Sequence, residues 1–126
     1  MEPRRAAERE TLEEVGVDLR GEEPLGRLDD LTGVSLPVVV SCFPYAVRRQ
    51  MSLTLNEEVA DAFWFPLEEL LDPGRQREAR FRFRGRGLAH PAVQVLGNGR
   101  PLLWGITYRL VFHFLDVMEC ASPRKS

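Results

Sequence analysis

The chain has 126 residues, a length that favours a single domain with its own apolar core. It is 44% hydrophobic and 29% charged, with a formal net charge of -2. This balance gives no overall argument for a nucleic-acid partner or an anionic membrane surface. The longest apolar run, within residues 36–47, is far shorter than the roughly 20 residues of a membrane span, so we expect no membrane partner.

Residues 3–15 are predicted to form a helix, because Pro3 suits the first helical turn and Gly16 suits the left-handed residue that ends a helix. Three glutamates of this segment fall within an arc of about 100° on such a helix. They are Glu10, Glu13 and Glu14. Like charges at this spacing repel one another. A solvated helix face is one interpretation, and a site for a hard divalent cation such as Mg²⁺ or Mn²⁺ is the other.

The middle of the chain is predicted to contain several strands. The candidate strands are residues 24–31, 36–47, 52–55 and 59–65. We expect the second of them, rich in valine and aromatic residues, to be central in a sheet. A short helix is predicted between Pro66 and Pro73.

The segment 79–85 alternates strictly between arginine and other residues, which predicts a strand. On this strand Phe81 and Phe83 would lie on one face, opposite Arg80, Arg82 and Arg84. Further along, Asn98-Gly99 predicts a turn, and apolar spacing from Leu103 predicts an amphipathic helix to about Glu119. A helix, several strands and a final helix together predict an α+β fold.

The sequence RETLEEVGV resembles the second half of the Nudix box, G-x5-E-x7-R-E-U-x-E-E-x-G-U, in which U is a bulky aliphatic residue. The positions that match are Arg9, Glu10, Glu13, Glu14, Gly16 and Val17. Thr11 stands where the pattern has an aliphatic residue. The resemblance implies a mixed β-sheet flanked by helices. It also implies a hydrolase that cleaves nucleoside diphosphates linked to another moiety, using Mg²⁺ or Mn²⁺.

By the same resemblance, Glu13 and Glu14 would be the principal metal ligands, and Glu10 would be a further ligand or a water-positioning catalytic group. Arg9 would support the site by pairing with one of the box glutamates. Gly16 would let the chain turn away beneath the site.

The front half of the box falls outside this sequence. The other motif glutamate belongs eight residues before Arg9, where Met1 stands. We therefore expect an N-terminally incomplete Nudix domain over residues 1–126, without the glycine-rich loop and the first strands. We also expect such a chain to be unstable or weakly active by itself.

Segments after the box are similar to those of coenzyme A diphosphatase-like members, with a proline-containing apolar strand, an E-V…F-W-F-P-L segment and a closing W-G-x-T helix. Coenzyme A or a related nucleoside diphosphate compound is thus the expected small-molecule substrate. Glu58 is a candidate extra ligand or base, with a solvated loop acid as the alternative. Arg82 and Arg84 are candidates for holding substrate phosphates.

Two other functions stay open. A non-catalytic module could keep the Nudix scaffold without turnover. The arginines between Arg75 and Arg86 could instead bind single-stranded nucleic acid, although a solvated strand face is the favoured interpretation and we do not expect a nucleic-acid partner. A homodimer is left open. Cys42 and Cys120 are predicted free thiols, which favours the cytoplasm, with mitochondrion and peroxisome left open.

Overall fold

The computed structural model describes residues 2–33 and 38–121, and within it the chain divides into two compact units. The first unit comprises Met1–Asp30 and Ser41–Trp64, and the second comprises Leu31–Val40 and Phe65–Ser126. The prediction of one domain over the whole chain is not tested by this division and stays a prediction.

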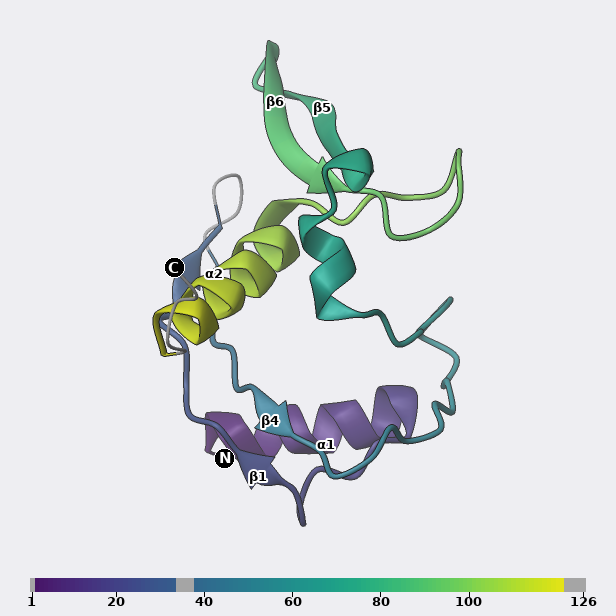
Figure 1. Ribbon diagram of the computed structural model, residues 1–126, viewed down its shortest axis with the longest axis vertical. Helices are drawn as coiled ribbons and strands as arrows, with labels where there is room; N and C mark the ends of the chain where they lie inside the picture. Colours follow the sequence, from purple (N-terminus) through teal and green to yellow (C-terminus); the bar gives the residue numbers. More distant parts are fainter. Residues whose placement is uncertain (1, 34–37, 122–126) are drawn as a thin grey trace. The chain divides into compact units, whose positions relative to one another are not determined.

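The first unit is built around the helix α1, Pro3–Val15, and a short ladder (Figure 1). In the ladder, β1 (Glu23–Pro24) pairs antiparallel with β4 (Tyr45–Ala46). The helix has the bounds that its proline and glycine predict, so that prediction is confirmed.

The pairing in the first unit is interrupted, so the long strands predicted over residues 24–31 and 36–47 are wrong in extent. Beyond β1, the amide of Leu25 donates to the carbonyl of Pro44 at 2.9 Å, and that of Leu28 donates to Cys42 at 3.0 Å. Between them Gly26 has φ +129°, a conformation that breaks a regular ladder. Pro44 has no N–H to donate to one. Part of the second predicted strand, residues 36 and 37, lies outside the described residues.

The strands predicted over residues 52–55 and 59–65 are also wrong, because neither segment forms one. The amide of Thr54 in the first segment instead bonds to the end of α1, whose last carbonyls have no partner within the helix. In the second, Trp64 is 43% exposed and donates from Nε1 to the carbonyl of Met51 at 2.8 Å.

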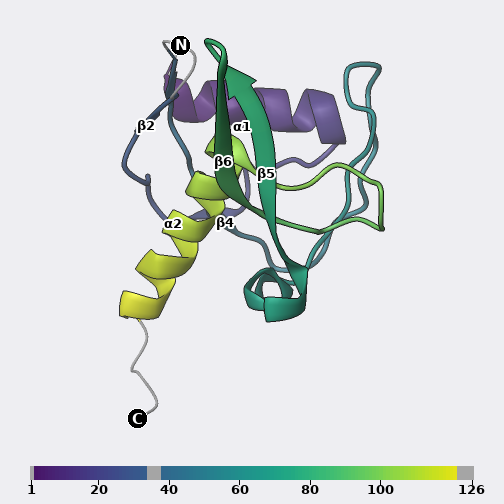
Figure 2. The same cartoon turned by 90° about the horizontal axis from the view of Figure 1, so that it is seen from above.

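The second unit contains two antiparallel ladders. In the shorter one, β2 (Leu31–Thr32) pairs with β3 (Val39–Val40), so the strand predicted to be central belongs to no larger sheet in the described chain. The longer ladder is a hairpin of β5 (Gln76–Phe83) and β6 (Arg86–Val93) (Figures 1 and 2). Its two turn residues both have positive φ, +51° at Arg84 and +76° at Gly85, as in a type I′ turn.

The predicted arginine alternation is confirmed along β5, where Phe81 and Phe83 are half-buried while Arg80 and Arg82 are exposed. Arg84 departs from the prediction because it occupies the turn and not the strand.

Two short 3-10 turns and a helix complete the second unit. The turns are η1 (Leu67–Leu71) and η2 (Pro73–Arg75), which confirms a short helical segment after Pro66. The helix α2, Gly105–Ala121, begins two residues later than predicted because Leu103 pairs with Val93 in an isolated bridge.

Few apolar side chains of the described residues are buried. These are Val17 and Leu28 in the first unit, and Leu70, Ala92 and Val93 in the second. Helices and small antiparallel sheets make this an α+β fold, as predicted. The described strands pair only antiparallel, in two-stranded ladders, so the mixed sheet implied by the resemblance does not appear among them. Neither described helix combines the length and apolar character that crossing a membrane requires.

Candidate functional site

The helix α1 ends at a position that only glycine can occupy without strain. Gly16 has φ +74°, and its amide donates to the carbonyl of Leu12 at 3.0 Å. A Cβ atom added here would lie 2.9 Å from the Cβ of Thr54, closer than real contacts allow. Both the backbone conformation and the neighbouring segment thus require glycine, which lets the chain leave the helix beneath its glutamates.

Three glutamates of α1, Glu10, Glu13 and Glu14, share one side of the helix. Glu10 and Glu13 are exposed, and Glu14, the next-to-last residue of the helix, is half-buried. The Nε of Arg9 lies 3.9 Å from Oε1 of Glu13. Both side chains are more than half exposed, so the pair adds little stability and leaves the carboxylate able to take another cation.

A distant loop is attached to the C-terminal end of α1. The amide of Thr54 donates to the carbonyl of Val15 at 2.8 Å, and the amide of Asn56 donates to the carbonyl of Glu14 at 3.1 Å. The side chain of Asn56 then accepts from the amide of Glu58 at 3.0 Å, which forms a tight turn. The loop therefore carries Glu58 at the end of the helix that bears the glutamates.

The unusual Thr11 lies on another side of α1 and is half-buried. Its hydroxyl donates to the carbonyl of Ala7 at 2.7 Å, so threonine replaces an aliphatic residue without leaving a hydroxyl unpaired. Thr11 and Val15 line an apolar cavity of about 360 Å³. The other lining residues are Val17, Leu19, Phe43, Tyr45, Val47, Leu53, Ala62, Phe63 and Trp64.

The contact of α1 with β4 was not predicted from the sequence. The hydroxyl of Tyr45 donates to Oε2 of Glu8 at 2.5 Å. Burial and this hydrogen bond raise the pKa of Tyr45 to about 12. The two residues are 37 positions apart and belong to no motif, so local sequence patterns could not have found them.

Four of the six arginines from Arg75 to Arg86 make contacts within their own part of the chain. Arg75 donates to the carbonyl of Gln94 at 3.1 Å and lies over the ring of Phe65 at 5.2 Å. Arg77 donates to carbonyls of its own segment, including that of Gly74 at 2.9 Å.

The remaining members of this stretch lie on the hairpin. Arg80 pairs with Glu78 at 3.1 Å, while Arg84 lies over Phe83 at 5.2 Å. These internal contacts weaken the nucleic-acid hypothesis. Arg82 and Arg84 belong to the second unit, and their role in holding substrate stays a prediction.

The donor chemistry of α1 fits a divalent cation, because carboxylate oxygens are the hard ligands that Mg²⁺ and Mn²⁺ prefer. The acidic, histidine and cysteine side chains of the described residues nevertheless form no group of three arranged around a common ion position. Ligation by Glu10, Glu13 and Glu14 therefore stays a prediction. Cys42 is a free, half-buried thiol, and the side chain of Cys120 lies outside the described part.

Two comparisons with known proteins bear on this helix. The chain is 44% identical over 75 residues to an uncharacterized protein of Schizosaccharomyces pombe. The match covers 53% of this chain and 23% of that relative, so the chain matches about a quarter of the relative's length. Residues 2–84, which include all of α1 and the loop at its end, match the model of the NUDIX domain. Because this match extends over more than half of the sequence, the chain belongs to the NUDIX domain family.

Proposed function

We propose that this chain carries the metal-binding glutamates of a Nudix diphosphatase, which hydrolyses a diphosphate linkage in a nucleotide derivative. The observation that carries the proposal is the exposed carboxylate face of α1, which is held by the left-handed Gly16 and by a loop bonded to the last helical carbonyls. The family match over residues 2–84 supports the same class of reaction.

Each glutamate has a proposed role at this site. Glu13 and Glu14 would hold a divalent ion, Mg²⁺ or Mn²⁺, and Glu10 would be a further ligand or would orient the attacking water. When bound, the ion neutralises charge on the diphosphate and lowers the pKa of water. Arg9 keeps the Glu13 carboxylate oriented through their ion pair. The water oxygen would bond to one phosphorus of the diphosphate as the bond from that phosphorus to the bridging oxygen breaks. The second phosphate would leave with the bridging oxygen, and the water would lose a proton to solvent.

The proposed substrate is coenzyme A or a related nucleoside diphosphate compound. Support comes from the sequence segments that follow α1, which are similar to those of coenzyme A diphosphatase-like members. Glu58 adds to this proposal, because its loop is bonded to the end of α1 and offers one more carboxylate there.

The test is the metal-dependent release of products from coenzyme A and from ADP-ribose. Glu13→Gln keeps the size of the side chain but removes its charge, and we expect hydrolysis to fall by about 100-fold or more. Glu23→Gln, on the exposed strand β1, is the matched control and should keep the wild-type rate. Equal rates in wild type and Glu13→Gln, or a rate unchanged by a chelator, would contradict the proposal.

A second candidate is a Nudix-scaffold module that binds nucleotides without turnover. It is favoured by one observation, namely that no three ligating side chains of the described chain are arranged around a common ion position. Under this hypothesis calorimetry would detect nucleotide binding, while product release would be absent with either metal. Only the measurement of product release therefore distinguishes the two candidates, because both predict nucleotide binding.

A further inference from the structure

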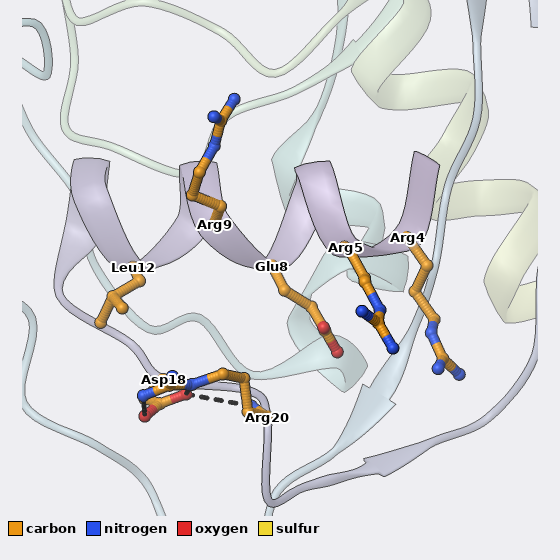
Figure 3. A pocket seen from close by; sticks show the side chains of 7 residues that line it. All are labelled: Arg4, Arg5, Glu8, Arg9, Leu12, Asp18 and Arg20. Carbon is orange, nitrogen blue, oxygen red and sulfur yellow. Dashed lines mark hydrogen bonds and ion pairs between the residues drawn. The ribbon is translucent and has the colours of Figure 1, made fainter. Parts of the chain in front are cut away.

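A second side of α1 forms a groove with the segment that follows the helix (Figure 3). The groove has a volume of about 450 Å³. Arg4, Arg5 and Glu8 project from the side of the helix on which Asp18 and Arg20 lie (Figure 3). The remaining lining residues are Arg9, which points away from these two, and Leu12.

The two acids of the groove are already engaged with groups other than Arg4 and Arg5. Asp18 accepts from Nε and Nη2 of Arg20 at 3.0 and 2.8 Å. These hydrogen bonds lower the pKa of Asp18 to about 2, so it is ionised at neutral pH and compensates Arg20. Glu8 accepts the hydroxyl of Tyr45.

Positive charge on the first turn of α1 has little compensation. The Nε of Arg4 is buried and has no hydrogen-bond partner in the described structure. Arg5 has only a loose pair with Glu2, at 3.9 Å between two exposed side chains. The first turn also contains no acidic residue, although the positive end of the helix dipole lies there. Two adjacent guanidinium groups thus face the groove, and the only carboxylate paired with either of them among the described residues is the loosely held Glu2.

We propose that this groove binds the diphosphate group of a small soluble ligand through Arg4 and Arg5, without a metal ion. A guanidinium group presents a planar set of donors that matches phosphate oxygens in pairs. Two adjacent guanidinium groups should bind an anion that carries several charges more tightly than they bind an anion with a single carboxylate. The volume is within the range of small-molecule sites. The site is separate from the carboxylate face, and it requires neither Glu13 nor hydrolysis.

The direct test is calorimetry of the full chain with inorganic pyrophosphate in the presence of a chelator. We expect saturable binding that weakens as salt rises. The double variant Arg4→Gln/Arg5→Gln should lower the affinity by about tenfold or more, because it removes charged hydrogen bonds. The control Arg48→Gln/Arg49→Gln has the same net charge and alters exposed arginines of the same unit, and its affinity should stay within about twofold.

The single variant Arg5→Gln should fold normally even if the double variant does not, because the Arg5 side chain is 75% exposed. It should weaken binding while the thermal melt stays unchanged. ADP should bind as inorganic pyrophosphate does, and citrate should bind more weakly.

Several results would overturn the proposal. They are the absence of pyrophosphate binding, an equal loss of pyrophosphate affinity in both double variants, equal affinity for citrate and pyrophosphate, and binding only to single-stranded oligonucleotides. The Glu13→Gln variant separates this proposal from the proposed hydrolysis. Pyrophosphate binding in the chelator should survive that substitution whether or not the wild type has turnover.

Discussion

The position of a Cβ atom at Gly16 lies 2.9 Å from the Cβ of Thr54, so the end of the glutamate-bearing helix and a loop 38 residues later leave no room for a side chain between them. Gly16 also has φ +74°, which L-residues with a Cβ atom rarely adopt. One glycine thus satisfies a local requirement of the helix end and a requirement of its distant neighbour.

Gly16→Ala should lower the free energy of unfolding by about 1–3 kcal/mol, from the left-handed conformation and the close contact together. Urea titration followed by circular dichroism measures this change. Gly21→Ala is the control, because a Cβ at Gly21 meets nothing within 4 Å. It should change stability by less than about 0.5 kcal/mol. Equal effects of the two substitutions would show that the contact with Thr54 is unimportant.

Glu58→Gln should lower the rate of diphosphate hydrolysis by about tenfold, as expected for a group that supports a metal site. The metal concentration that gives half-maximal rate should rise as well. Glu57→Gln is matched in charge, exposure and position in the same turn, and it should leave both quantities unchanged. Identical kinetics for the two variants would show that Glu58 is a solvated loop acid without a role at the metal site.

The Tyr45–Glu8 contact predicts a pH dependence of stability. The pKa of Tyr45 is raised from 10.0 to about 12, so the folded state holds the phenol proton more tightly than the unfolded state does. The stabilisation is present in full below pH 10 and is lost as pH rises toward 12. Urea midpoints between pH 9 and 11.5 should fall more steeply for wild type than for Tyr45→Phe. Parallel curves for the two proteins would contradict this prediction.

Arg75 should contribute more to the stability of the second unit than the other arginines near the hairpin. It bonds to the carbonyl of Gln94 and lies over the ring of Phe65, and its side chain is only 32% exposed. Arg75→Ala should cost about 1–2 kcal/mol of unfolding free energy. Arg82→Ala, at an exposed position of β5, should cost less than about 0.5 kcal/mol. Urea titrations of both variants provide the comparison, and equal losses would refute the structural role of Arg75.

Elements specified by local chemistry were predicted well from the sequence. Pro3 and Gly16 determine the two ends of α1, and the alternation around Phe81 identifies β5. Asn98-Gly99 forms the expected turn, in which Gly99 has φ +75°. Each of these depends on residues close together in the chain, so their spacing carries the necessary information.

Elements that depend on distant partners were not predicted. The segment 52–55 has the composition of a strand, yet its amide at Thr54 bonds to a helix carbonyl. The interruption of the first ladder depends on Gly26, whose conformation cannot be inferred from its neighbours. The groove of Arg4 and Arg5 requires the Asp18–Arg20 segment to fold back along α1, which no spacing in the sequence indicates.

The bonds from Thr54 and Asn56 to the last carbonyls of α1 make these two amides natural reporters of the helix. Fraying of the final helical turn would break both bonds and open both amides to hydrogen exchange. An ion that stabilises the turn around Glu14 would then slow exchange at these two loop amides, which lie far from Glu14 in the sequence. Occupancy of the carboxylate face could therefore be followed by backbone NMR without substrate and without turnover.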